Sequence, residues 1–298
     1  MIAKRQNQFL SIIMPSLPSH FNGVGYTKEK NSLPLESIRV PVPQPSANQV
    51  LIHVYSSSLN PLEYKLALLN FFGRTPPVIL GFDLSGIVVA VGANVKNVAV
   101  GDEVMAMADS GWATGGKGGY AIARDYLTVK KSSSLSFDEA AALPICFLSA
   151  YIGDYPHLNP GDTIYIPGGA GGVGHLAVQM AAHALGASRV ISSGSKPETI
   201  AQAKRFGASH VFNYRADVAV AKVKEFTDGK GVDLVFDATY SEAGFVESAK
   251  TVKPGGKWVV LGVGPGKASR TVQTESPVDS ILAEKGAKHL FRGGISNH

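Results

Sequence analysis

The sequence predicts an α/β fold in two parts: a β-rich, partly closed domain, then a doubly wound parallel sheet. The first observation is that short β-like runs in the first half are separated by Gly, Pro, Asn and Ser. The second is that the other half alternates apolar strands with helical segments, as parallel βαβ units do. The third is a glycine-rich run from Gly168 to Gly174 directly after an apolar strand. A chain of 298 residues is long enough for both parts.

In the first half, each predicted strand is short and ends at a turn signal. The clearest β-like runs are 49–55, 78–80, 86–91 and 120–122. Pro-rich and Gly-Ala-Asn or Gly-Asp sequences lie between them, and such residues favour turns. Two short helices are predicted in the same half, over 61–69 and 137–142.

In the second half, strands and helices alternate at the spacing of βαβ units. Strands are predicted over 163–167, 189–193, 210–214, 232–238 and 257–261, and helices over 175–185, 198–206, 217–227 and 242–251. The strands are almost continuously apolar, as burial on both faces of a parallel sheet requires. The pattern therefore predicts an open sheet with helices on both sides.

The glycine run fits a dinucleotide-binding turn. Gly169, Gly171 and Gly174 have the G-x-G-x-x-G spacing between a strand and a helix, where the backbone can approach a pyrophosphate at the helix N-terminus. An ordinary strand-to-helix turn is the alternative interpretation. The predicted phosphate contacts are Gly169, Ala170, Gly171, Gly172 and Val173.

The residues after the second strand of this half favour NADPH over NADH. An Asp or Glu about twenty residues beyond the glycines would bind the ribose 2′-hydroxyl of NAD. Here the strand ends without a carboxylate, and Ser193, Ser195 and Lys196 offer hydroxyls and a cation that suit a 2′-phosphate. A solvent-exposed lysine at a helix start is the alternative for Lys196.

The composition is that of a water-soluble enzyme. The formal net charge is +5 with dispersed basic residues, whereas nucleic-acid binding calls for a clustered basic stripe. One cysteine excludes an intrachain disulfide, and no apolar run approaches a membrane span. We therefore expect a cytoplasmic protein. The acid-free extension 1–19, with Lys4 and Arg5, allows a mitochondrial presequence as an alternative.

The order of short motifs along the chain is specific. It includes VPVPQP at 40–45, NQVLI at 48–52, LNPLEYK at 59–65, LGFDLSGIV at 80–88, VGDEV at 100–104, the glycine run, FGA at 206–208 and KPGG at 253–256. In this order the sequence resembles the medium-chain dehydrogenase/reductase superfamily. Within it, the chain is most similar to the zinc-free branch of quinone oxidoreductases (zeta-crystallin-like) and enone (enoyl) reductases.

This resemblance implies a domain plan. An N-terminal extension, 1–19, would precede a GroES-like, β-rich catalytic domain, 20–143. A Rossmann domain that binds NADPH would follow over 144–275, with a C-terminal tail over 276–298. Relatives commonly pair through the last strand of the coenzyme sheet, here near 257–263, so the resemblance implies a homodimer.

The resemblance also implies roles for individual residues. The segment 59–65 would line the nicotinamide and substrate cleft, with Asn60 fixing the ribose or nicotinamide and Tyr64 or Lys65 serving as donors to the substrate. The family usually has Asp where Glu63 stands. A turn that starts a helix, with Lys65 facing solvent, is the alternative. Further implied cofactor contacts are Ser149, Tyr214, Leu261, Gly262 and Val263.

The residues that could act as metal ligands argue against a zinc site. A four-thiolate structural site is impossible with one cysteine per chain unless chains share it. Zinc-dependent relatives carry a Cys near Asn60 and a His near Phe82, and this chain has neither. The eight histidines show no ligand-like grouping. We therefore expect no metal, and hence no zinc-assisted alcohol dehydrogenation.

These observations predict an NADPH-dependent oxidoreductase that transfers hydride to a quinone or to the C=C bond of an α,β-unsaturated carbonyl. Two alternatives stay open. One is an impaired NADPH-binding protein, because we find no counterpart of the family's returning C-terminal segment. The other is an enoyl reductase that acts on a carrier-bound acyl chain.

Overall fold

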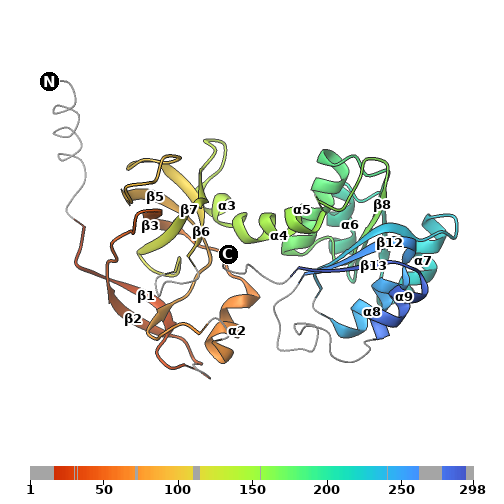
Figure 1. Ribbon diagram of the computed structural model, residues 1–298, viewed down its shortest axis with the longest axis horizontal. Helices are drawn as coiled ribbons and strands as arrows, with labels where there is room; N and C mark the ends of the chain where they lie inside the picture. The colour runs from red at the N-terminus through yellow and green to blue at the C-terminus, as the bar shows by residue number, and fades with distance from the viewer. Residues whose placement is uncertain are drawn as a thin grey trace. The chain divides into compact units, whose positions relative to one another are not determined.

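The computed structural model describes residues 17–29, 31, 33–70, 73–109, 115–154, 156–239, 241–261 and 277–292. The chain divides into two compact units, Met1–Ile145 and Cys146–His298 (Figure 1). The division falls two residues after the predicted boundary at 143. The predicted N-terminal extension lies almost wholly outside the described residues.

The first unit is built around a closed β-barrel, where the sequence predicts a partly closed one. Its strands are β3 (Gln49–Ser56), β5 (Asp83–Val91), β6 (Glu103–Ala108) and β7 (Tyr120–Lys130). Closure depends on β7, which is far longer than the predicted run 120–122. Its first half pairs with β3 and its second half pairs with β6. Small and branched apolar residues such as Val50, Leu84 and Ala106 fill the interior.

The other elements of this unit flank the barrel. A three-stranded sheet has the order β2-β1-β4. Helix α2 starts with proline at its first turn, as the sequence predicts, and occupies the predicted range 61–69. The bounds are β1 His20–Tyr26, β2 Glu36–Pro41, β4 Val78–Ile79 and α2 Pro61–Leu69.

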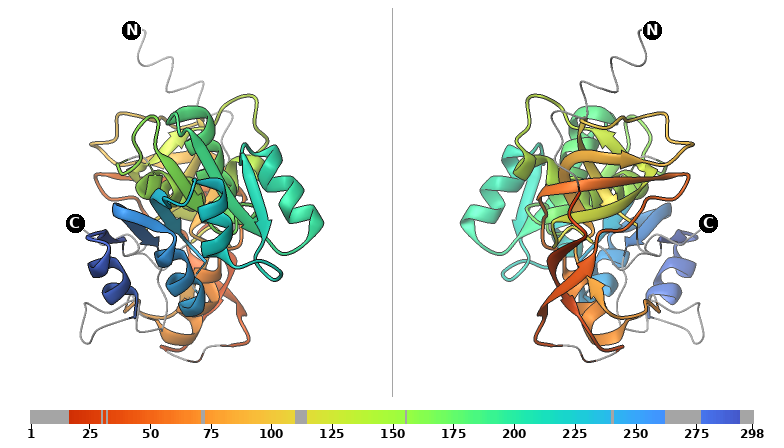
Figure 2. Two further views of the ribbon diagram at one scale, coloured as in Figure 1. Left: turned by 90° about the vertical axis from the view of Figure 1, so that its right-hand side faces the viewer. Right: turned by 90° about the vertical axis from the view of Figure 1, so that its left-hand side faces the viewer.

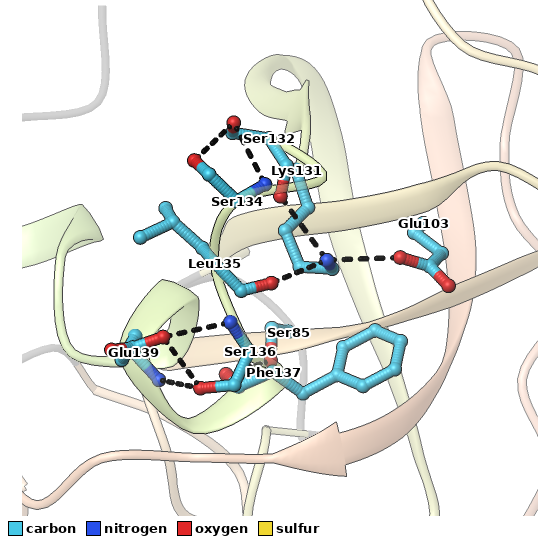
Figure 3. A network of polar contacts seen from close by, with 9 residues as sticks. All are labelled: Ser85, Glu103, Lys131, Ser132, Ser134, Leu135, Ser136, Phe137 and Glu139. Atoms are coloured by element: carbon cyan, nitrogen blue, oxygen red, sulfur yellow. Dashed lines mark hydrogen bonds and ion pairs between the residues drawn. The ribbon is translucent and has the colours of Figure 1, made fainter.

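A polar network fixes the chain where it leaves the barrel (Figure 3). The almost fully buried Lys131 ammonium lies 2.9 Å from Glu103 Oε2 and donates to the Leu135 carbonyl at 2.7 Å. Ser136 then caps α3 (Phe137–Ala141) in a capping box with Glu139. Helix α4 (Pro144–Asp154) follows directly.

The second unit is a six-stranded parallel sheet with the order β10-β9-β8-β11-β12-β13 (Figures 1 and 2). Counted from β8, this is the 3-2-1-4-5-6 order of dinucleotide-binding sheets, whose ligands lie at the carboxyl ends of the strands where the order reverses. The strands are β8 Thr163–Ile166, β9 Arg189–Gly194, β10 His210–Asn213, β11 Val232–Asp237, β12 Val252–Leu261 and β13 Lys288–Arg292.

Helices cover both faces of this sheet, as predicted. Consecutive strand residues alternate between the two cores: Ile164 and Ile166 pack with α5 and α6, whereas Tyr165 packs with α7, α8 and α9. The helices are α5 Gly172–Gln179, η1 Met180–Ala184, α6 Pro197–Arg205, α7 Ala219–Phe226, α8 Glu242–Lys250 and α9 Pro277–Glu284. The predicted single helix 175–185 is therefore α5 continued by the π-helical turn η1.

Three features of the second unit differ from the prediction. Strand β12 begins at Val252, five residues before the predicted start at 257. The predicted Pro254-Gly255 turn lies inside the strand, where the pairing with β11 is irregular. Residues 277–292, which were predicted to belong to a tail, form α9 and β13 and extend the unit. Strand β13 also covers the far side of β12, so the segment 257–261 is not the sheet edge expected for dimer pairing.

Among the described residues, no helix is both long enough and apolar enough to cross a membrane.

Candidate functional site

The glycine turn of the second unit has the geometry of a phosphate-binding turn. Gly171 is the N-cap of α5 and offers no side-chain cap to the first helical N–H groups. A Cβ on Gly169 would lie 2.2 Å from Ser192 Oγ, and one on Gly174 would lie 2.3 Å from the Gly168 carbonyl oxygen. These positions therefore require glycine. Gly171 and Gly172 are exposed, so the residues fit a pyrophosphate at the helix N-terminus.

Two serines of β9, Ser192 and Ser193, contact the backbone of this turn. The Ser192 hydroxyl donates to the Ile166 carbonyl at 2.7 Å and accepts from the Gly169 N–H at 3.0 Å. The Ser193 oxygen lies 3.4 Å from the Gly168 nitrogen and 3.4 Å from the Tyr165 hydroxyl. Ser193 is 2% exposed, so its hydroxyl is committed to the turn itself. Its predicted contact with the cofactor stays a prediction.

The ends of β9 and β10 form a polar corner. Asn213 pairs with Gly194, and the Tyr214 N–H donates to the Gly194 carbonyl at 3.1 Å. This register brings Ser195 beside Tyr214, and Lys196 is the next residue along the chain. The Tyr214 hydroxyl accepts a hydrogen bond from Ser195, which lowers the pKa of Tyr214.

Arg215 belongs to the same corner, and the sequence analysis missed it. Its guanidinium also bonds to the Tyr214 hydroxyl and contributes to the lowered pKa of that tyrosine. Both Arg215 and Lys196 are exposed. The signal was available, because a basic residue directly follows a predicted cofactor contact. The corner thus presents two cations and two hydroxyls, a donor set that fits a phosphate group. The neighbouring Asp217 carboxylate accepts from the Asn213 N–H at 3.0 Å.

The remaining predicted cofactor residues lie in separate places. The Ser149 hydroxyl, in the middle of α4, makes no hydrogen bond in the described part of the chain, so it is not committed to a carbonyl of its own helix. Leu261 ends β12 with its side chain in the core. Gly262 and Val263 lie outside the described residues.

In the first unit, the loop before α2 is held by the buried Asp83. Asn60 is the N-cap residue of α2, yet its side chain does not cap the helix. Its Nδ2 donates instead to Asp83 Oδ2 at 2.9 Å, and the Ser58 hydroxyl donates to the same oxygen at 3.1 Å. Asp83 Oδ1 accepts from the Ile145 N–H at 2.8 Å. The sequence analysis assigns no role to Asp83 and missed this connection.

Two more charged side chains hold the same loop. The Lys117 ammonium donates to the carbonyl oxygens of Ser57, at 3.1 Å, and of Ser58. The buried Glu63 carboxylate accepts from the Phe82 N–H at 3.4 Å and from the backbone N–H of Asn60. Glu63, which stands where the family usually has Asp, thus accepts hydrogen bonds from two backbone N–H groups.

Burial controls the charges of this cluster. It raises the pKa of Glu63, and it raises the pKa of Asp83 to about 6 against the opposing effect of its hydrogen bonds. Burial also lowers the pKa of Lys117, while Glu63 and Asp83 favour its charged form. Asp83 is therefore ionised at pH 7.5 and holds the loop as an ion.

Tyr64 and Lys65, the predicted donors, follow on α2 and take no part in the bonds to Asp83. Tyr64 is half exposed, and Lys65 is partly buried. Their catalytic roles stay predictions.

The side chains at positions 60 and 82 do not supply the zinc ligands of zinc-dependent relatives. An amide bonded to a carboxylate, Asn60, and a phenyl ring, Phe82, stand where zinc-dependent relatives have Cys and His. Within the described ranges, no group of three or more His, Cys, Asp or Glu side chains is placed to hold a metal ion.

Comparison with known proteins agrees with both units. Residues 46–137 match the family model "Alcohol dehydrogenase GroES-like domain", and residues 172–297 match "Zinc-binding dehydrogenase". The 2-methylene-furan-3-one reductase of Solanum lycopersicum is 36% identical over 83% of this chain and 63% of its own length. The quinone oxidoreductase of Pongo abelii is 30% identical over 82% of this chain and 72% of its own.

A solved structure supports the same assignment. A mycobacterial protein in complex with NADPH superposes with a TM-score of 0.75, at 26% identity, over 92% of this chain and 81% of that one. The chain belongs to the medium-chain dehydrogenase/reductase superfamily. Its relatives there are quinone and enone oxidoreductases, and it spans 63% of the length of the tomato reductase.

Proposed function

We propose that this protein is an NADPH-dependent reductase that transfers hydride to the C=C bond of an α,β-unsaturated carbonyl or to a quinone. One observation carries the proposal: the unit that holds the glycine turn also has a corner with two cations and two hydroxyls, and no carboxylate ends strand β9. Lys196, Arg215, Ser195 and Tyr214 suit the 2′-phosphate that distinguishes NADPH from NADH.

The relatives support the same reaction class. One is named for a methylene-furanone, which is an enone, and the other for quinones. When bound, NADPH supplies the hydride. The chain must then stabilise negative charge on the acceptor oxygen by hydrogen bonding, because the residues near Asn60 do not fit zinc. We assign this donation to Tyr64 or Lys65 and the positioning of the cofactor to Asn60.

The proposal is tested by NADPH oxidation, followed at 340 nm, with a short alkenal and a simple quinone in parallel. We expect oxidation that depends on acceptor concentration, and a rate at least tenfold lower with the same concentration of NADH. Bound NADPH without turnover on either acceptor would instead identify a non-catalytic cofactor-binding protein.

The cofactor preference is tested at the polar corner. Replacing Lys196 or Arg215 with Ala removes one cation each, and we expect each change to lower the NADPH:NADH ratio of kcat/KM about tenfold. The exposed Lys230→Ala, a change of equal charge away from the corner, is the control. An unchanged ratio in both corner variants contradicts the assignment of the 2′-phosphate.

We also propose that the protein is a homodimer, by analogy with its relatives. In the described chain the strands at the two edges of the sheet are β10 and β13, and β13 is the one beside the predicted segment near 257–263. Sedimentation equilibrium of the purified protein tests this, with a mass near 31.3 kDa contradicting it.

A further inference from the structure

The side chain of Asn60 is held in one orientation by a partner that can only accept. A carboxamide presents an NH2 group on one side and an oxygen on the other, and the two are told apart by their hydrogen-bond partners. An ionised carboxylate has no donor, so the 2.9 Å contact with Asp83 places Nδ2 inward. The Asn60 oxygen therefore faces away from Asp83.

The carboxylate itself has no freedom to turn. Asp83 is fully buried, and both of its oxygens are engaged: Oδ1 with the Ile145 N–H, and Oδ2 with Ser58 and Asn60. The charged groups that face it are Lys117, which attracts it, and Glu63, which repels it. Because the Ile145 N–H and the Ser58 hydroxyl fix the Asp83 carboxylate, this carboxylate can set the orientation of the Asn60 side chain.

We propose that Asp83 is a positioning residue that keeps the Asn60 carboxamide with its NH2 group inward, so that the Asn60 oxygen serves as an acceptor for a hydroxyl or amide donor of the bound nicotinamide nucleotide. This inference rests on the proposed function and adds a residue and a direction of hydrogen bonding to it. Asp83 acts through Asn60 and does not itself touch the cofactor.

The substitution Asp83→Asn tests the orientation with almost no change of shape. An asparagine has one accepting oxygen, which cannot serve both Ile145 and Asn60. If Oδ1 keeps the Ile145 bond, the new NH2 group faces Asn60 Nδ2. The Asn60 amide then relieves the conflict by turning over, which takes its oxygen inward and removes the acceptor from the cofactor.

The experiment is a double-mutant cycle on NADPH affinity, measured by cofactor fluorescence. We expect D83N and N60A each to raise the Kd for NADPH about tenfold, and the double variant to match N60A within about twofold, because the effect of Asp83 passes through Asn60. Independent losses that multiply, or an unchanged Kd in D83N, would overturn the inference.

Asp109→Asn is the matched control. Asp109 is a buried acid in the same unit, and it accepts from the side-chain amide of Gln49 at 2.9 Å and from Arg124 at 2.6 Å. We expect this variant to change the Kd for NADPH by less than about twofold, since no bond joins Asp109 to Asn60. A tenfold loss here would mean that any buried acid of this unit affects binding, and would overturn a specific role for Asp83.

A measurement on the unsubstituted protein keeps the inference testable even if D83N does not fold. The side-chain amide resonances of Asn60, assigned from their loss in N60A, are followed between pH 4.5 and 7.5. They should shift with a midpoint near 6, where Asp83 loses its proton. Resonances that do not move would show that Asp83 does not hold Asn60. Neither readout needs turnover, so a failure of the proposed reaction is distinguishable from a failure of this inference.

Discussion

Asp83 and Asp154 are equally buried, but they differ in the hydrogen-bond partners that surround their carboxyl groups. Both are fully shielded from solvent, and both are associated with α4: Asp83 accepts from an N–H in its first turn, and Asp154 is its last residue. Asp83 has three hydrogen-bond donors. In the described structure, neither carboxyl oxygen of Asp154 has a hydrogen-bond partner.

The difference appears in their protonation. Burial raises the pKa of Asp83 only to about 6, whereas burial raises the pKa of Asp154 well above its ordinary value. The last turn of a helix also carries partial negative charge, which disfavours an anion there. At pH 7.5 Asp83 is therefore an ion that organises a loop, whereas the surroundings of Asp154 favour the neutral form of that acid. The hydrogen-bond partners of these two carboxyl groups, rather than the extent of their burial, account for the difference between them.

The largest contrast should appear when each acid is removed at pH 7.5. Asp83→Ala leaves Ser58, Asn60 and Ile145 without their acceptor, and we expect it to lower the free energy of unfolding by about 3 kcal/mol. Asp154→Leu replaces an unpaired polar group with an apolar one of similar size, and we expect a gain of about 1 kcal/mol. Urea denaturation of both variants measures this. A loss of similar size in both would contradict the comparison.

The pH dependence of stability sharpens the comparison further. A carboxyl group whose pKa is raised by folding contributes stability that is fully present below its unfolded pKa, about 4, and is lost as the pH rises through the folded pKa. For Asp83 this loss is complete a little above pH 6. For Asp154 the loss has the same sign, because burial raises the pKa of that acid well above its ordinary value.

We therefore expect the stability advantage of Asp154→Asn over the unsubstituted protein to grow as the pH rises above about 4, by up to about 1.4 kcal/mol per pH unit. Urea denaturation at four pH values checks this. Stability curves that run parallel at all four pH values would mean that Asp154 does not bind its proton more tightly in the folded protein.

The smallest effect should come from the cation beside Asp83. Lys117→Met removes the charge that favours the Asp83 carboxylate and the bonds to the carbonyls of Ser57 and Ser58. We expect the midpoint of the Asn60 amide titration to rise and the Kd for NADPH to increase about threefold. Lys130→Met, at an exposed pair with Asp102, is the control and should leave both unchanged.

Much of the fold could be predicted because its signals are local. The apolar runs and glycine turn specify the parallel sheet, and the Asn60-Pro61 start of α2 is visible in two adjacent residues. The closure of the barrel could not be predicted, because it depends on how the two halves of β7 pair with different strands. The placement of β13 likewise depends on distant pairing with β12.

In the candidate site, too, some residues could be predicted from local sequence and others depend on contacts between distant residues. The glycine turn and Lys196 follow from spacing alone. The role of Asp83 does not, because its bond to Asn60 joins residues 23 apart and the bonds of Lys117 join residues 59 and 60 apart. Nothing in the sequence marks Asp154, since its condition is defined by what surrounds it.

The most direct test of the proposed function is the fate of the hydride. Reduction of an alkenal is run with NADPH carrying deuterium at either face of nicotinamide C4, and the product is examined by NMR. The proposal predicts deuterium from one of the two labelled cofactors at the β-carbon, and a solvent proton at the α-carbon. A product with no deuterium from either cofactor would contradict hydride transfer by this protein.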